Sequence, residues 1–304
     1  KNGEMEQLTK CPCCENESIK SSAKIKDFAF SGITFNLDKC STCGFTFTNP
    51  RPDINEIGKY YQSENYVPHH SSNPSFFHKV YIRVRNYMYT KKLSYINQHL
   101  QHPINDISLL DYGAASGDFL AYCSAQSIRQ LEGVEQDSAC RQDAMSLHGI
   151  ALKPVDDFYA LPSNSFHVIT LWHVLEHIHN LEEVVTCFHH FLKEDGLLVI
   201  SVPNNNCLDK KIYGDYWAAY DVPRHLYHFN TATISLLMQR LGFSLEQTYP
   251  MPFDAYYIAL YSEQYKKSNK ILAIIRALIN GFKSNIAAKK SGEYSSLTYV
   301  FRKQ

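Results

Sequence analysis

The sequence predicts an α/β protein with a doubly wound sheet, preceded by a small cysteine-rich module. Three observations support this fold class. Two C-x-x-C pairs lie close to the N-terminus, a short apolar run at residues 107–110 leads into a glycine-containing turn and a helical pattern, and a second apolar run ends in an acidic residue. A strand, a glycine turn and a helix in this order begin a doubly wound α/β sheet.

Length and composition exclude several classes of protein. The 304 residues suffice for two domains or one large domain with an appendage. The 30 Lys and Arg balance the 30 Asp and Glu, so the chain lacks the positive field of a general nucleic-acid binder. Aromatic residues make up 13% of the chain, which excludes a mostly disordered protein. No apolar stretch reaches the roughly 18 residues that a membrane span needs. We therefore expect a cytoplasmic protein without a membrane span.

Four of the nine cysteines form two C-x-x-C pairs, Cys11 with Cys14 and Cys40 with Cys43. This layout is typical of a structural zinc site with four thiolate ligands. A short segment cannot bury enough apolar surface to fold alone, and a bound metal can replace the missing core. Cys13 is an alternative to Cys14, which we prefer because its distance along the chain from Cys11 equals the spacing of the second pair. Four free thiols in a reducing compartment are the other interpretation.

Changes in composition divide the chain into three parts. We expect residues 1–52 to form the zinc module, which ends in a proline-rich segment. Residues 53–105 are expected to be a helical linker or cap, because residues 76–100 carry apolar side chains at helical spacing. Residues 106–304 are expected to hold the main α/β domain.

The turn after the first apolar run indicates a nucleotide-like ligand without phosphates. Its glycines are Gly113 and Gly117, and the second apolar run ends at Glu135, where an acid can accept hydrogen bonds from a ribose. A dinucleotide site would need glycines where Ala115 and Asp118 stand, and no P-loop follows. S-adenosylmethionine has a ribose and an adenine but no phosphate, and it fits this pattern. An ordinary strand–helix turn is the alternative interpretation.

The ordered motifs resemble those of class I S-adenosylmethionine-dependent methyltransferases. The first motif of one subgroup, D-x-G-x-x-x-G-x-F-L, begins at Asp111. The C-P-x-C, C-x-x-C-G and N-P-R-P segments of the N-terminal part are similar to those of sugar and small-molecule methyltransferases with a zinc ribbon. The resemblance implies a Rossmann-like, seven-stranded methyltransferase sheet, whose third strand we expect to end near residues 155–158. It also implies S-adenosyl-L-methionine and a structural Zn²⁺ as cofactors.

The same resemblance implies a set of cofactor-binding residues. Asp111 would hold the glycine loop or the ammonium group of the cofactor, Glu135 would bind the ribose hydroxyls, and Asp157 would accept the adenine amino group. Phe158 would lie beside the adenine ring. The full predicted set is Asp111, Gly113, Ala114, Gly117, Glu135, Gln136, Asp157, Phe158 and Trp172.

Histidines are the first candidates for a catalytic base, because their pKa lies near neutrality. His173, Glu176 and His177 follow the predicted fourth strand and would share one face of a helical turn. The segment resembles the E-x-x-E-H cation site of quinone-type O-methyltransferases, with His173 in place of the first acid. His225 lies in a segment similar to the family's W-x(6)-R-H-x-x-x-F motif and is our first candidate base, with His228 second. Purely structural roles for Glu176, His177 and His225 are the alternative.

Two insertions, residues 205–230 and 253–292, are expected to form a helical and aromatic lid. The second contains an amphipathic helix at residues 269–288, for which ordinary packing is the first interpretation and a lid or dimer contact is the alternative. The predicted function is methyl transfer to a small-molecule acceptor, a sugar or nucleotide-sugar of polysaccharide or natural-product biosynthesis. One alternative is an RNA methyltransferase with a zinc-ribbon recognition module, although we expect no nucleic-acid partner. Another is a non-catalytic S-adenosylmethionine-binding scaffold. The sequence leaves the oligomeric state open.

Overall fold

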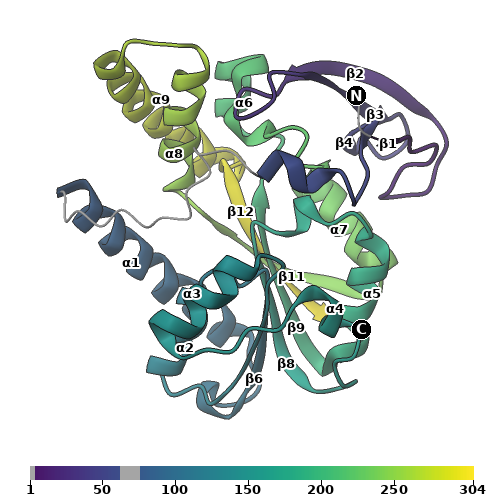
Figure 1. Cartoon of the computed structure of the whole chain (residues 1–304), viewed down its shortest axis with the longest axis vertical. Coiled ribbons are helices and arrows are strands. Elements are labelled where there is room, and N and C mark those ends of the chain that lie inside the picture. The colour runs from purple at the N-terminus through teal and green to yellow at the C-terminus, as the bar shows by residue number, and fades with distance from the viewer. Residues whose placement is uncertain (1–3, 62–75) are drawn as a thin grey trace.

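The computed structural model describes residues 4–61 and 76–304 and consists of a central sheet with helices on both faces, a small N-terminal sheet and a projecting pair of helices (Figure 1). The predicted linker falls partly on residues 62–75, which lie outside the described residues. The helical pattern predicted at residues 76–100 is confirmed, and it forms a single helix, α1, Phe76–His99.

The central sheet has six strands in the order β11-β12-β9-β8-β6-β7. The four strands β9, β8, β6 and β7 are parallel, whereas β12 runs antiparallel to both β9 and β11. Apolar side chains fill both faces of the parallel part, as expected for a sheet covered on both sides. The strands are β6 Ser108–Tyr112, β7 Gln130–Val134, β8 Phe166–Trp172, β9 Leu192–Pro203, β11 Phe243–Pro250 and β12 Ser296–Lys303.

The sequence predicts seven strands in the main sheet, whereas the described residues form six. The missing strand is the third in chain order. The segment before residue 155 makes a single parallel bridge, Val134 with Lys153, and the chain then turns into the short helix α4, Val155–Phe158. Pro154 lies directly before this helix, and proline lacks the N–H that a continuing strand would need. The third predicted strand is therefore reduced to one bridge at the edge of the sheet.

Helices cover the two faces of the sheet and form two apolar cores. One core includes side chains of α1, α2 and α3, and the other includes side chains of α4, α5 and α7 (Figure 1). The bounds of the helices not yet given are α2 Asp118–Ala125, α3 Ser138–His148, α5 Leu181–Phe191 and α7 Thr231–Arg240. Short 3-10 segments lie at Ile57–Tyr61, Ile104–Asp106 and Leu175–His177.

The N-terminal module shares its sheet with the insertion at residues 205–230. Its strands are β2 Ile19–Lys26, β3 Thr34–Cys40 and β4 Thr46–Thr48, and the fourth strand of the sheet is β10, Tyr227–His228. A second small sheet pairs β1, Met5–Glu6, with β5, Arg51–Pro52. The module is therefore joined to the main domain by backbone hydrogen bonds between β4 and β10.

The two insertions contain helices α6, Leu208–Tyr213, α8, Asp254–Tyr265, and α9, Lys270–Ser291, with 3-10 turns at Gly214–Tyr216 and Ala218–Tyr220. The expectation of ordinary packing for the amphipathic helix is wrong for its large apolar side chains, which are exposed. The small residues of α9 face α8 and α6 instead. Within the described residues, α9 is the one helix whose length and composition would allow it to cross a membrane.

Candidate functional site

The glycine loop between β6 and α2 has three residues in left-handed backbone conformations. Gly113 has a φ of 78°, Ala115 a φ of 48° and Gly117 a φ of 74°. Gly113 also tolerates no side chain, since a Cβ there would lie 2.4 Å from Cγ2 of Val174. A non-glycine residue such as Ala115 adopts this conformation only at a cost in conformational energy. The loop is thus held in one specific shape beside the carboxyl end of β8.

Glu135 connects this loop to the end of β7. Its Oε2 atom accepts a hydrogen bond from the backbone N–H of Ala115 at 2.8 Å, and its Oε1 atom accepts one from Asp137 at 2.8 Å. The side chain remains partly exposed at the carboxyl edge of the sheet. Ligands of doubly wound sheets bind at this edge, so the carboxylate lies where the sequence predicts a ribose site.

Asp111, Lys92 and Trp172 form a second group at this edge. Asp111 is almost fully buried at the end of β6 and accepts a hydrogen bond from Oγ1 of Thr170 at 2.6 Å. Burial raises the pKa of Asp111, and burial lowers the pKa of Lys92. The Nζ atom of Lys92 lies 4.0 Å from the ring centroid of Trp172. The indole Nε1 of Trp172 is buried and has no hydrogen-bond partner among the described residues.

The remaining predicted cofactor residues occupy different environments. Gln136 and Asp157 are exposed, and Ala114 is buried. Phe158 is fully buried and packs its ring against Tyr112, at a centroid distance of 4.8 Å. This core position does not support the prediction that Phe158 lies beside an adenine, and we leave it out of the candidate site.

One carboxylate and two imidazoles form a cluster beside the segment that follows β8. Two of the three residues belong to that segment, and the third belongs to the 205–230 insertion. Possible ligand atoms of Glu176, His177 and His225 all lie within 4.8 Å of one another. The Nδ1–H of His225 donates to the carbonyl of Ala219 at 2.9 Å, and the Nδ1–H of His177 donates to the carbonyl of Arg224 at 2.9 Å. These bonds fix both rings and leave each Nε2 atom without a hydrogen bond within the described part of the chain. The arrangement can therefore accept a proton or a cation.

Glu176 is the most buried member of this cluster, with 1% of its surface exposed. Neither carboxylate oxygen has a hydrogen-bond partner among residues 4–61 and 76–304. Burial alone would raise its pKa, but the neighbouring His173 and His225 lower the pKa of Glu176 below its usual value. Burial lowers the pKa of His177 to about 4, which makes this imidazole a weak base.

His173 links the cluster to helix α8. Its Nδ1 atom lies 3.6 Å from Oε1 of Glu176, and its Nε2 atom lies 3.1 Å from Oδ2 of Asp254. Burial opposes protonation of the ring, but the neighbouring carboxylates of Asp254 and Glu176 raise the pKa of His173 to about 10. The imidazolium is therefore charged at neutral pH, and the predicted meeting of residues 173, 176 and 177 is found in the structure.

His228 lies outside this cluster. It belongs to β10, is nearly fully buried, and its Nε2 atom lies 3.4 Å from Oγ1 of Thr48 in the N-terminal module. Burial lowers the pKa of His228 well below its usual value. This environment favours a structural role, in contrast to its prediction as the second candidate base.

The four cysteines chosen by spacing are brought together by the structure. The sulfur atoms of Cys11 and Cys43 lie 3.6 Å apart, as do those of Cys14 and Cys40. A tetrahedral zinc site with Zn–S bonds of about 2.3 Å needs sulfur atoms about 3.8 Å apart, so the four positions fit this metal. Cys13 lies beside them, but its thiol donates to the carbonyl of Thr233 at 3.3 Å.

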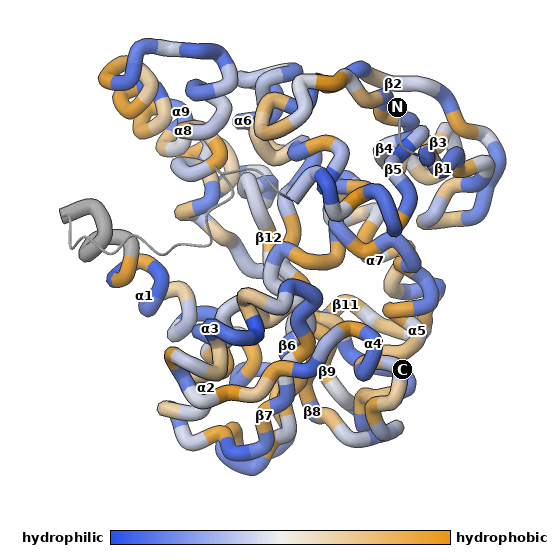
Figure 2. The backbone as a smooth tube through the Cα atoms, viewed as in Figure 1, coloured by the Kyte–Doolittle hydropathy of each residue, from blue (hydrophilic) through white to orange (hydrophobic). Residues whose placement is uncertain are grey.

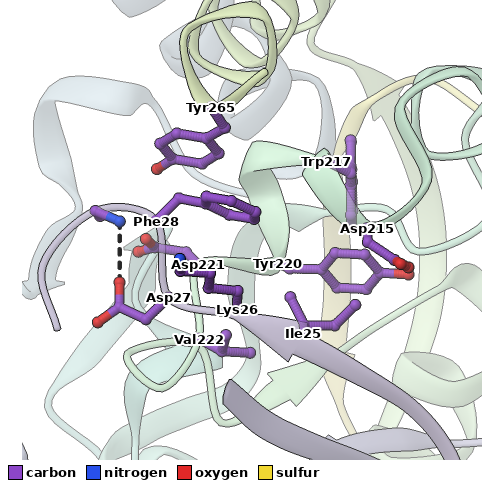
Figure 3. A pocket seen from close by; sticks show the side chains of 11 residues that line it. Ile25, Lys26, Asp27, Phe28, Asp215, Trp217, Tyr220, Asp221, Val222 and Tyr265 are labelled. Atoms are coloured by element: carbon purple, nitrogen blue, oxygen red, sulfur yellow. Dashed lines mark hydrogen bonds between the residues drawn. The ribbon is translucent and has the colours of Figure 1, made fainter. Parts of the chain in front are cut away.

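A pocket lies between the N-terminal module, the 205–230 insertion and α8 (Figure 3). Phe28 stacks on Tyr265 at a centroid distance of 5.2 Å, and Tyr220 contributes a further ring to the lining. Asp221 also lines the pocket, and its Oδ2 atom lies 3.7 Å from Nε2 of His225. The pocket therefore borders the histidine cluster.

Sequence reasoning missed both this pocket and Lys92, because each depends on segments that are distant in the chain.

Comparison with known proteins identifies the family. The family described as "Methyltransferase domain" matches residues 83–248, which is more than half of the chain. No curated protein matches the sequence. Among solved structures, a Galdieria sulphuraria protein provisionally assigned as a sarcosine dimethylglycine methyltransferase has a TM-score of 0.50 at 14% identity. That match covers 72% of this chain and 85% of the other.

Two further solved structures are similar at lower TM-scores. The geranyl diphosphate C-methyltransferase of Streptomyces coelicolor has a TM-score of 0.48 at 13% identity, with 80% of this chain and 89% of the other covered. A SAM-dependent methyltransferase of Archaeoglobus fulgidus has a TM-score of 0.46 at 15% identity, with 75% and 100% covered. The family match, supported by the sheet topology, carries the assignment. The chain therefore belongs to the methyltransferase-domain family and is an S-adenosylmethionine-dependent methyltransferase.

Proposed function

We propose that this methyltransferase acts on a small-molecule acceptor, a sugar or nucleotide-sugar. The observation that carries the proposal is a continuous series of acidic and imidazole side chains, which begins at the aromatic pocket and ends at the cofactor edge. It runs from Asp221 through His225, Glu176 and His173 to Asp254. A base in this series can take the proton from an acceptor hydroxyl that reaches from the pocket to the cofactor edge, where the methyl group would pass directly to the acceptor oxygen.

The cofactor site is proposed at the glycine loop and the ends of β6, β7 and β8. The loop at Gly113–Gly117 would hold the amino-acid half of S-adenosylmethionine, Glu135 would accept the ribose hydroxyls, and Asp157 would bind the adenine amino group. The buried Nε1–H of Trp172, which lacks a partner among the described residues, is a donor for a polar group bound beside it. When bound, the cofactor supplies an electrophilic methyl group and its own leaving group.

The pocket that Figure 3 shows is proposed to contact one edge of the acceptor, whose reacting hydroxyl would lie at the cofactor edge. Sugars present apolar C–H faces and polar edges, and the rings of Phe28 and Tyr220 are among the side chains that line this pocket. The carboxylates of Asp215 and Asp221 line the same pocket and can accept hydrogen bonds from sugar hydroxyls.

His225 is proposed as the proton acceptor. Its Nδ1–H is held by the carbonyl of Ala219, which fixes the tautomer with the lone pair on Nε2. The Oδ2 atom of Asp221 lies 3.7 Å from this Nε2 atom, and a ligand atom of Glu176 lies within 4.8 Å of the ring. His177 is the poorer candidate because of its low pKa.

A structural Zn²⁺ is proposed at Cys11, Cys14, Cys40 and Cys43. Four thiolates complete a tetrahedral coordination shell and leave no position for a substrate. The ion would stabilise the N-terminal module and, through the pairing of β4 with β10, the loop that carries His225.

The proposal is tested with labelled S-adenosylmethionine, cell extract and the His225→Asn variant. We expect label in a low-mass carbohydrate product, and we expect His225→Asn to slow its formation by about 10²–10⁴-fold with unchanged cofactor affinity. His102→Asn, a substitution at an exposed histidine, is the matched control and is expected to keep the wild-type rate. Label in RNA would contradict the proposed acceptor, and a wild-type rate for His225→Asn would remove this residue from the reaction.

A further inference from the structure

Helix α9 presents a broad apolar face that the described residues do not cover. Eight large apolar side chains on this helix are each 47–70% exposed. They are Ile271, Leu272, Ile274, Ile275, Leu278, Ile279, Phe282 and Ile286. The backbone of α9 in Figure 2 contains many hydrophobic residues, drawn in orange. Contiguous apolar surfaces of this kind mark sites of interaction with a protein or a membrane.

The opposite face of α9 is already fixed to the domain. The buried residues of the helix are all small and lie three or four positions apart: Ala273, Ala277, Gly281, Ser284 and Ala288. A Cβ on Gly281 would lie 2.6 Å from Cδ1 of Tyr256, which shows how closely α9 approaches α8. Oγ of Ser284 donates to Oδ1 of Asp209 in α6 at 2.9 Å. The helix therefore cannot turn its large side chains inward without losing these contacts.

The charges on α9 have a single sign. The helix carries five exposed cations and no Asp or Glu, although the whole chain is formally neutral. Arg276 lies 3.7 Å from Glu263 of α8, and the other four cations have no ion pair on the helix itself. The five are Lys270, Arg276, Lys283, Lys289 and Lys290.

We propose that α9 binds the surface of an anionic lipid bilayer. The apolar face would enter the boundary between headgroups and acyl chains, and the cations would meet lipid phosphates, as in other interfacial amphipathic helices. A second copy of the chain on this face would bring two sets of five cations together, with no acid on either helix to pair with them. The helix lies on the membrane and does not cross it, because its small-residue face is packed on α8 and α6.

This inference does not depend on the proposed acceptor. Binding of lipid by α9 can be measured without cofactor or substrate. It does affect where the reaction takes place, since Asp254 at the start of α8 contacts His173 beside the cofactor edge. The helix pair α8–α9 thus connects the membrane-binding face to the reaction site.

Flotation of the full chain with vesicles tests the inference. We expect binding to vesicles of phosphatidylcholine mixed with phosphatidylglycerol that is roughly tenfold or more tighter than binding to phosphatidylcholine alone, and that weakens as salt is raised. Leu278→Asn should abolish the binding. The matched control is Leu147→Asn on α3, because Leu147 is 55% exposed and Leu278 is 56% exposed. Equal melting temperatures of the two variants would exclude unfolding as the cause.

A second variant separates the contribution of the cations to membrane binding from that of the apolar side chains. Lys289→Gln combined with Lys290→Gln should weaken binding to the anionic vesicles and leave the weak binding to phosphatidylcholine unchanged. Absence of wild-type binding, or equal losses in Leu278→Asn and Leu147→Asn, would overturn the proposal. A wild-type dimer in light scattering that Leu278→Asn converts to a monomer, without vesicle binding, would assign the face to a second copy instead.

Discussion

Two residues at the proposed cofactor edge have backbone conformations that are unfavourable for non-glycine residues. Neighbouring side chains stabilise both. Ala115 has a left-handed φ of 48°, and its N–H donates to Glu135 at 2.8 Å. That hydrogen bond joins the glycine loop to the end of β7 and offsets part of the conformational energy that the left-handed backbone of Ala115 costs. His173 is a second case, since it also has a positive φ, of 59°, and carries a charge between two carboxylates. Both conformations lie where ligands are expected, which is where strained residues concentrate.

The charge on His173 predicts a pH-dependent stability. Its pKa is raised from 6.5 to about 10 because the carboxylates of Asp254 and Glu176 lie beside the protonated ring. The stabilisation is fully present below pH 6.5, where both folded and unfolded chains are protonated, and it is lost as the pH rises through about 10. We expect His173→Gln to be less stable than wild type in denaturant titrations near pH 6.5 and equally stable above pH 10. Asp254→Asn should show the same trend, and a pH-independent difference would contradict the assignment.

Elements that depend on local sequence were predicted well, and those that depend on distant pairing were not. Strands β6 and β7 lie at the two predicted apolar runs, the first before the glycine turn and the second before Glu135. The third predicted strand was lost because Pro154 ends its pairing after one bridge. The strand β10 was not foreseen, since two residues carry no pattern and only pairing with β4 makes them a strand.

The N-terminal module provides a prediction about metal content. Cys43→Ser removes one of the four clustered thiols and should release zinc and destabilise the module and its contact with β10. Elemental analysis of the purified chain measures the loss. Cys13→Ser is the matched control, since Cys13 hydrogen-bonds to Thr233 and should leave the metal content unchanged. Equal metal content in wild type and Cys43→Ser would refute the site.

Over the whole molecule, the sequence predicted the family and the sheet edge at which the cofactor site is proposed, but not how distant segments come together there. Asp111, Gly113 and Glu135 follow from a local motif and a strand end. Lys92 lies over Trp172 only because α1 packs across this edge, and the pocket forms only where three separate segments meet. The outward apolar face of α9 was also unpredictable, because the same periodicity suits a helix packed in a core.

The central claim is that the Gly113–Gly117 loop and Glu135 bind S-adenosylmethionine. Calorimetric titration of this compound into wild type and Glu135→Ala tests it most directly, with Glu132→Ala on the same strand as the control. We predict that the wild type binds, that Glu135→Ala loses about 1–3 kcal/mol of binding free energy, the cost of removing a charged hydrogen-bond acceptor, and that Glu132→Ala binds as the wild type does. A wild-type chain that releases no heat, or a Glu135→Ala variant with unaltered affinity, would contradict the account.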